Sequence, residues 1–355
     1  MTPRENLRTL LDGGAPRWLP FSIDIGSQPG LSAPSERIFT RETGSRSPAE
    51  YFDTDVRCVS LQTEFGGDNP HGLHESLPQG ATFDEWGNAH CASSAEGTTD
   101  HMLPAAASAQ SVRDIERLPA PLIEARPDTT RLTAWHEAGY PVFGYAGSIY
   151  EWSWWLRGME QFLMDLVSDA AVAEAIIEKV AGHTTRLALA SDRAGIDVLC
   201  FFDDAGMQTG MQISPDLWRR FIKPAWQRVL DAVRQQTPSA RFFLHSCGQI
   251  DAIVPDIVDL GFHILHPIQP ECMDFARFHR EFGDKIVLTA TISSQKILPF
   301  GSPEEVRAEV RRLAEIVGPE HRAFLTPSNV IQPETPWANI AAFAEEAKAV
   351  RDQER

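Results

Sequence analysis

A histidine and a cysteine stand two residues apart in the segment HSCG, which directly follows the apolar run FFL. In an extended chain, residues i and i+2 point to the same side, so His245 and Cys247 can share one ligand. Neutral imidazole and thiolate are ligands that zinc prefers, and a catalytic zinc needs three protein ligands and an open position. The third ligand could be Cys272, His266 or a carboxylate such as that of Asp204. The alternative is a hydrogen-bonded histidine beside a buried, inert cysteine.

Two adjacent carboxylates, Asp203 and Asp204, follow the strongly apolar run IDVLCFF. Burial of such groups is costly unless a cation or a hydrogen-bond donor meets them. They could act as general acid or base, hold a cationic substrate or ligate a metal. The alternative is the N-cap of a following helix. We expect one of the pair to cap and the other to face a cavity, with Asp204 assigned as catalytic and Asp203 as substrate-binding.

The segment YEWSWWLRG at 150–158 holds three tryptophans within four residues. Such a cluster can wall an apolar ligand cavity or bind a cation through its π faces, and it can equally be plain packing. We predict that Tyr150, Trp154 and Trp155 contact the substrate. Three further predicted substrate contacts are polar residues without diagnostic spacing: Gln208, Gln269 and Asn329.

Eight short apolar runs, each followed by an amphipathic stretch, must position these side chains. Nearly continuous apolar strands are typical of a parallel sheet that is buried on both faces. Eight strand–helix units predict an α/β fold with a single TIM-type (βα)8 barrel across residues 1–355, with function at the carboxyl ends of the strands. The runs are Leu19–Ile25, Val56–Leu61, Pro141–Tyr145, Ile196–Phe202, Ala240–Leu244, Phe262–Leu265, Lys285–Leu288 and Arg322–Leu325.

The stretch 63–118 breaks this pattern, because it is rich in Gly, Pro, Ser, His and Asp and contains the hairpin-like segment DEWGN. It is too long for a simple connection between a strand and a helix. We predict an elaborated loop region over the carboxyl-terminal mouth of the barrel, in addition to an elaborated N-terminal region. The alternative is a disordered linker.

Charge and cysteine usage limit the partners and the compartment. Thirty-two Lys and Arg against 49 Asp and Glu give a formal net charge of −17. This balance argues against nucleic acid or an anionic membrane as partner, since phosphate binding depends on clustered cations. No run approaches 18 apolar residues, and the N-terminus MTPRENLRTLLDGG does not read as a secretory signal. Five widely spread cysteines form no disulfide framework, which indicates the reducing cytoplasm.

The order and spacing of several motifs resemble the uroporphyrinogen decarboxylase-like superfamily. The resemblance spans essentially the whole chain and implies a TIM-type barrel with its active site at the carboxyl-terminal mouth. The superfamily contains true uroporphyrinogen decarboxylases and zinc-dependent, corrinoid-linked methyltransferases. The segments that carry the resemblance include DVLCFFDDAGMQTGMQISPDLWRRFIKP, FFLHSCGQI, HPIQPECMD, KIVLTATISSQKILPFGSPEEV and TPSNVIQPETPWANI.

The decarboxylase branch of the superfamily fits poorly. Its arginine-rich motif, which grips substrate carboxylates, should fall near residues 20–34, and that stretch contains no arginine. Its tyrosine, its serine and its late histidine correspond here to Trp154, Asp204 and Asn329. These departures argue against porphyrinogen chemistry.

The methyltransferase branch fits better. His245 and Cys247 match its H-x-C zinc pair, whereas its third ligand, a cysteine, corresponds to Asn329, a poor zinc ligand. The metal could therefore be held through Cys272 or His266, or be lost. The GG-I-D motif that is common in the family is replaced by TATIS at 289–293, which suggests a specialised substrate.

Our first hypothesis is thus a methyltransferase in which zinc on His245, Cys247 and Cys272 activates a bound thiol. That thiol would take a methyl group from a small donor or from a methylated corrinoid on a partner protein. The second hypothesis is a metal-independent decarboxylase or lyase of a small acid or a porphyrinogen, with Asp204 as proton donor. The third is a binding protein that has lost its metal site. In each case the ligand is a small molecule, and the chain could form a homodimer.

Overall fold

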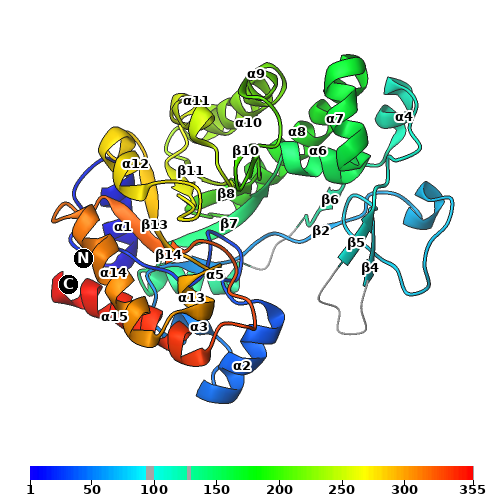
Figure 1. Ribbon diagram of the computed structural model, residues 1–355. Coiled ribbons are helices and arrows are strands. Elements are labelled where there is room, and N and C mark those ends of the chain that lie inside the picture. The colour runs from blue at the N-terminus through cyan, green and yellow to red at the C-terminus, as the bar shows by residue number, and fades with distance from the viewer. Residues whose placement is uncertain (93–99, 126–128, 355) are drawn as a thin grey trace.

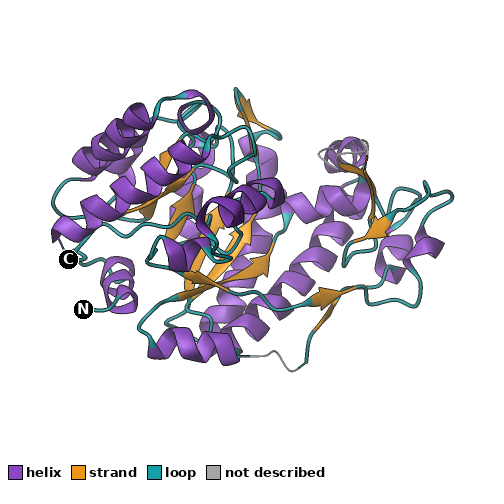
Figure 2. Ribbon diagram, turned by 90° about the horizontal axis from the view of Figure 1, so that it is seen from below, coloured by secondary structure: helices purple, strands orange, loops and turns teal. Residues whose placement is uncertain are grey.

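A seven-stranded parallel sheet forms the centre of the residues that the computed structural model describes, 1–92, 100–125 and 129–354. Its strands are almost entirely buried, as the nearly continuous apolar runs predicted, and helices surround them (Figure 2). In spatial order the strands are β1 (Arg57–Cys58), β7 (Val142–Gly147), β8 (Val198–Phe202), β11 (Arg241–His245), β12 (Ile264–His266), β13 (Val287–Ile292) and β14 (Ala323–Pro327).

The predicted first strand, Leu19–Ile25, contributes a single bridge and no regular strand. Phe21 pairs in parallel with Leu325 of β14, and the Ser22 N–H donates to the Leu325 carbonyl over 3.0 Å. On its other side, the Phe21 carbonyl accepts from the N–H of Asp55, two residues before β1. The segment therefore lies between the last and the first strand of the sheet and closes the ring, so the TIM-type barrel is confirmed.

Helices follow most strands and pack on the outside of the barrel, where α8 contacts β7 and α10 and where α14 contacts β13 and α15 (Figure 1). Their bounds are α1 (Pro3–Leu11), α2 (Ala33–Thr43), α3 (Pro48–Tyr51), α5 (Thr130–Glu137), α6 (Tyr150–Arg157), α7 (Met159–Ser168), α8 (Ala170–Arg193), α9 (Pro215–Leu217), α10 (Lys223–Gln236), α11 (Val254–Leu260), α12 (Phe275–Phe282), α13 (Ile297–Phe300), α14 (Pro303–Val317) and α15 (Trp337–Glu354). Shorter helical turns are η1 (Pro70–Leu73), η2 (Trp218–Ile222) and η3 (Asp251–Ile253).

The barrel interior is filled with large apolar side chains and is closed at its amino-terminal end by α1. Phe143 contacts the rings of Phe243 and Phe324, with both ring centroids 6.2 Å away. Leu7 and Leu10 of α1 belong to the same buried cluster. Because side chains alternate along a strand, the residue two positions after Phe243 also points inward. That residue is His245, so the packed interior places this imidazole at the carboxyl-terminal mouth.

The stretch 63–118 folds as a lobe beside the barrel (Figure 1) and is not a simple linker, although residues 93–99 lie outside the described part. The hairpin predicted around DEWGN is confirmed, since the Asp84 N–H donates to the Asn88 carbonyl between two paired strands. The buried ring of Trp86 packs against Trp152 of α6 and His183 of α8. The elements of the lobe and its neighbourhood are β2 (Thr63–Glu64), β3 (Thr82–Phe83), β4 (Ala89–Ala92), β5 (Asp100–Leu103), α4 (Val112–Arg117) and β6 (Leu122–Ile123).

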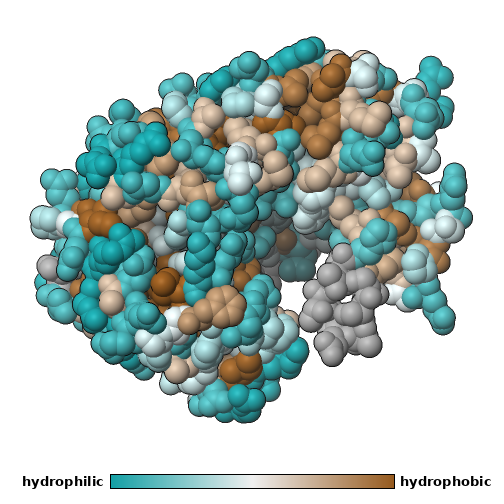
Figure 3. Space-filling model, viewed as in Figure 1, coloured by the Kyte–Doolittle hydropathy of each residue, from teal (hydrophilic) through white to brown (hydrophobic). Residues whose placement is uncertain are grey.

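The surface in Figure 3 is mostly hydrophilic, in keeping with the acidic composition. An apolar patch lies over α7, where Met159, Met164 and Val167 are exposed. Across the described ranges, no helix combines the length and the apolar character that crossing a membrane requires.

Candidate metal and substrate site

The loops that follow β8 and β11 are held together by hydrogen bonds at the mouth of the barrel. The Ser246 hydroxyl donates to the Asp203 carbonyl over 2.9 Å and accepts from the Ala205 N–H over 3.1 Å. The Gly206 N–H donates to the Cys247 carbonyl over 3.1 Å. These contacts bring the side chain of Asp204 alongside Cys247.

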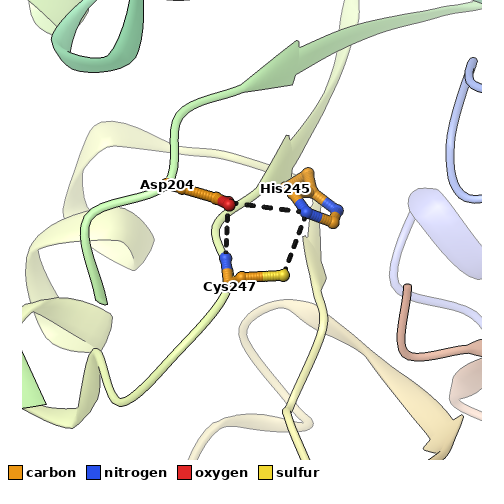
Figure 4. A group of neighbouring side chains, drawn as sticks. All are labelled: Asp204, His245 and Cys247. Atoms are coloured by element: carbon orange, nitrogen blue, oxygen red, sulfur yellow. Dashed lines mark hydrogen bonds and ion pairs between the residues drawn. The ribbon is translucent and has the colours of Figure 1, made fainter. Parts of the chain in front are cut away.

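Asp204, His245 and Cys247 converge at this point (Figure 4), each offering a ligand atom within 4.8 Å of the other two. The Cys247 Sγ lies 3.2 Å from His245 Nε2, and Asp204 Oδ1 lies 3.5 Å from the same nitrogen. The carboxylate is held in place because Asp204 Oδ1 accepts the Cys247 N–H over 2.7 Å. One imidazole, one thiol and one carboxylate form a donor set that suits zinc.

The hydrogen bonds of His266 determine which nitrogen of His245 is free. The Pro327 carbonyl, 2.9 Å from His266 Nε2, can only accept, so that nitrogen carries the hydrogen. Burial lowers the pKa values of both histidines, that of His245 to about 3, and both rings are therefore neutral at pH 7. His266 Nδ1 must then accept from the Nδ1–H of His245, 2.8 Å away. This leaves the lone pair of His245 Nε2 directed toward Cys247 and Asp204.

The charges around the three ligand atoms favour a bound cation. Removal from water raises the pKa of Asp204, and it raises that of Glu151 further with the help of the Asp204 and Asp203 charges. Burial and the carboxylates of Asp204 and Glu151 also raise the pKa of the Cys247 thiol. A divalent cation would offset this concentration of negative charge and favour the deprotonated thiol and carboxylate. The residues present therefore fit a zinc ion on chemical grounds.

Cys272, predicted as the third metal ligand, lies outside this group of ligand atoms. It is half-buried in the turn after β12, where its N–H donates to the Gln269 carbonyl over 3.1 Å. Burial, with the nearby Glu271 and Asp251 charges, raises its pKa to about 11. Asp204, one of the alternatives considered for the third ligand, is the residue whose ligand atom lies beside those of His245 and Cys247, and a metal-binding role of Cys272 stays a prediction. His266, the other alternative, supports His245 from behind.

The Asp203 carboxylate, predicted to bind substrate, accepts hydrogen bonds from the residues at the start of α6. Its Oδ1 accepts from the Ser148 hydroxyl over 2.8 Å and from the N–H groups of Ile149 and Glu151. Its Oδ2 accepts from the indole of Trp226 over 2.9 Å. The expected division of the acidic pair is therefore present, with Asp203 capping a helix and Asp204 facing the site. The hydrogen bonds of Asp203 are those of a helix cap, and its role in substrate binding stays a prediction.

Asn329 and Gln269 both reach the site from the neighbouring loops. Asn329 Nδ2 donates to the Cys247 Sγ over 3.2 Å, at the position where the family resemblance places a third cysteine ligand. Gln269 Oε1 accepts the Gly248 N–H over 2.8 Å, which steadies the loop beside the thiol. Together with the exposed Gln208, they line a cavity of about 110 Å³ at Cys247. The structure thus places these three predicted contacts at one cavity.

The aromatic segment of α6 lies apart from that cavity. Tyr150 is fully buried and packs against Phe162, with ring centroids 6.0 Å apart. Trp154 and Trp155 are partly buried and contact each other edge to face. Their packing gives no contact that supports the predicted substrate roles of these three aromatic residues.

Glu151 was missed as a site residue because the sequence analysis weighed only the aromatic members of its segment. Burial and the charges of Asp204 and Asp203 raise the pKa of its carboxyl group, which indicates that it lies near the candidate metal-binding group. The signal that could have identified it is its position, since it is the first acidic residue after the carboxyl end of β7. Acidic residues at that point of a barrel strand are candidates for the site.

The chain is similar to proteins of two activities. A methylcobamide:CoM methyltransferase, MtaA, of Methanosarcina barkeri is 29% identical over 206 residues, which cover 58% of this chain and 52% of that protein. A uroporphyrinogen decarboxylase of Pelodictyon phaeoclathratiforme is 23% identical over 150 residues, covering 42% of this chain and 40% of that protein. The chain thus spans about half the length, or less, of these curated relatives.

A solved methyltransferase from Methanosarcina mazei supports the fold along the whole chain. It superposes with a TM-score of 0.66 at 17% identity and covers 98% of this chain and 99% of that structure. In addition, residues 100–350 match the family model for uroporphyrinogen decarboxylase (URO-D). The matched region runs from β5 to the last helix and includes every ligand atom of the candidate metal site. The chain belongs to the uroporphyrinogen decarboxylase family.

Proposed function

We propose that this protein is a methyltransferase that methylates a thiol bound at Asp204, His245 and Cys247. The observation that carries the proposal is the convergence of these three ligand atoms, with the lone pair of His245 Nε2 directed toward the other two. The names of the curated methyltransferase relatives support the reaction class and the corrinoid as methyl donor. A corrinoid carried by a partner protein, or a small methylated corrinoid, is the donor we propose for this chain.

A zinc ion on these residues would lower the pKa of a substrate thiol and keep it as thiolate at neutral pH. The residues themselves hold the donor atoms in place. Asp204 is fixed by the Cys247 N–H, and His245 is fixed by His266. The substrate sulfur forms its bond to the methyl carbon while the donor–methyl bond breaks, and that electron pair stays with the donor. The thiol proton leaves to water.

The test is methyl transfer from methylcobalamin to a small thiol by zinc-loaded protein, followed by the corrinoid absorbance and by mass spectrometry of the thioether. Cys247→Ser should reduce the rate at least a hundredfold, because it removes one ligand atom of the site. Cys272→Ser is the matched control and should leave the rate unchanged, since this thiol lies outside the group. Equal loss in both variants, or full activity of zinc-free protein, would contradict the proposal.

A second candidate is a metal-independent decarboxylase or lyase. The observation that favours it is the raised pKa of Asp204, which would keep a proton available for transfer near the cavity. The cavity itself opposes it, because within the described part of the chain no Arg, Lys or His lines the space beside Cys247 to hold a carboxylate substrate. Release of carbon dioxide from a small acid by chelator-treated protein would establish this candidate, and its absence would leave the methyltransferase.

A further inference from the structure

The cavity beside Cys247 is lined by polar side chains that are almost all uncharged. It is about 110 Å³ in volume and is built from the loops that follow β8, β11, β12, β13 and β14. Apart from the Cys247 thiol, none of the described residues that line it carries an ionisable side chain. The polar side chains that line it are Gln208, Gln269, Ser294, Gln295, Ser328 and Asn329.

Gln269 is a buried amide with hydrogen-bonding capacity to spare. Its side chain is enclosed, with 3% of the residue exposed. The Gly248 N–H can only donate, so Gln269 presents its oxygen there and its NH₂ group must face elsewhere. That nitrogen has no partner among the residues described. A buried donor without a partner is costly, so an oxygen on a ligand in the cavity would satisfy it.

The surroundings of the cavity disfavour an anion. The Asp204 carboxylate lies on the metal-ligand side of the cavity, where its Oδ1 is 2.7 Å from the Cys247 backbone nitrogen. The closest cation along the lining loops is Lys296, which follows Gln295 but is exposed and does not line the cavity. A sulfonate or carboxylate tail would therefore enter a space that offers hydrogen bonds without a compensating positive charge.

We propose that this cavity is the subsite for the thiol acceptor and that it selects a small, uncharged, hydrogen-bonding thiol over an anionic one. This inference rests on the proposed function, since it assigns the tail of the thiol whose sulfur binds at the metal site. Its volume suits a tail of a few non-hydrogen atoms, because one water occupies about 30 Å³ of the liquid. The acceptor of this chain would then differ from CoM, the anionic thiol that appears in the name of the curated methyltransferase relatives.

Three thiols that differ only in the tail test this proposal: 2-mercaptoethanol, 2-mercaptoethanesulfonate (CoM) and 2-aminoethanethiol. Calorimetric titration of the zinc-loaded protein should show at least tenfold tighter binding of 2-mercaptoethanol than of CoM, whereas 2-aminoethanethiol, whose tail carries the opposite charge, should not show this loss. Equal or tighter binding of CoM would overturn the proposal. Because this titration needs no methyl donor, an absence of methyl transfer with the neutral preference intact would count against the proposed function alone.

Variants of the lining sharpen the test. Gln269→Glu keeps the oxygen that accepts from Gly248 but replaces the amide donor by a negative charge, so binding of 2-mercaptoethanol should weaken about tenfold. Gln208→Lys adds a cation at an exposed lining position, which the fold tolerates, and should improve CoM binding about tenfold. Lys296→Gln is the control and should change neither affinity. Unchanged affinities in both lining variants, or loss of CoM binding in the control, would contradict the assignment of this cavity.

Discussion

His245 and His266 occupy paired positions of β11 and β12, and their Nδ1 atoms lie 2.8 Å apart. Strand register makes this contact possible, because partners in a parallel pair point to the same side of the sheet. The Pro327 carbonyl behind His266 then sets the tautomers of both rings in turn. The two neutral histidines form a chain of hydrogen bonds that ends in the free nitrogen facing Cys247.

Replacement of His266 should weaken zinc binding although His266 is not a ligand. His266→Phe keeps the ring packing and removes the acceptor for His245 Nδ1–H, so zinc affinity should fall about 10–100-fold. His266→Gln can still donate to Pro327 and accept from His245, and it should retain most of the affinity. Competition with a chromophoric chelator measures both. His263→Gln, immediately before β12, is the control and should leave zinc affinity unchanged. Parental zinc affinity in folded His266→Phe would show that the contact between His266 and His245 is irrelevant.

Asn329→Cys should strengthen zinc binding. The amide already contacts the Cys247 Sγ over 3.2 Å, so a thiol at this position would lie within reach of the same ion. A further thiolate ligand should raise the affinity by at least tenfold in the same chelator competition. Asn329→Ala is the control, because it removes the amide without adding a thiol and so shows how much of the change in zinc affinity comes from loss of the amide alone. An Asn329→Cys affinity no higher than that of Asn329→Ala would mean that residue 329 cannot reach the metal.

Gly248→Ala should disrupt the loop that carries Cys247. Gly248 has a φ of +88°, and a Cβ there would lie 2.3 Å from the carbonyl carbon of Gly206. The strained backbone and the clash should lower the free energy of unfolding by about 1–3 kcal/mol and weaken zinc binding. At Gly182, inside α8, an added Cβ would have no atom within 4 Å. Gly182→Ala should therefore raise the free energy of unfolding by about 0.5–1 kcal/mol. Urea unfolding measures both, and a Gly248→Ala protein as stable as the parent would refute this account of the loop.

The stability of the protein should fall in acid partly through His183. This histidine is buried between Trp86 and Trp152, and burial lowers its pKa to about 4. Below pH 6.5 the unfolded chain binds the proton first, so the stability from neutral His183 is present above pH 6.5 and is lost as pH falls toward 4. The size of this effect is about 3 kcal/mol.

A His183→Phe variant isolates the contribution of this side chain, because the ring packing is kept and the titration is removed. Its free energy of unfolding should decline less than that of the parent between pH 7 and pH 4, by about 3 kcal/mol. Denaturant unfolding at a series of pH values gives the two curves. Parallel curves would show that another group carries the acid sensitivity.

The barrel could be predicted from the sequence because its strands are short, apolar and separated by amphipathic helices. The closure of the ring at Leu19–Ile25 could not, since its geometry depends on contacts with residues about 300 positions away. Pro20 has no N–H for a strand ladder, and Asp24 turns away to accept the N–H of Gly30. The run therefore has the composition of a strand while its backbone makes only a bridge.

The site was predictable where it depended on strand periodicity and not where it depended on loop paths. His245 and Cys247 share a side because they are two residues apart at a strand end. Asp203 and Asp204 must point in different directions for the same reason, but only the pairing with β11 determines which one meets Cys247. Cys272 was predicted as a metal ligand from its residue type alone. Its N–H donates to the Gln269 carbonyl in the turn after β12, and there its thiol lies outside the group of ligand atoms.

The most direct test of the account is zinc X-ray absorption of the purified protein before and after addition of 2-mercaptoethanol. We predict one zinc per chain with a single sulfur at about 2.3 Å and nitrogen or oxygen ligands at about 2.0–2.2 Å. Addition of the thiol should raise the sulfur count to two, and Cys247→Ser should lose the metal. Two sulfur ligands without added thiol, or full zinc content in Cys247→Ser, would contradict a site built from Asp204, His245 and Cys247.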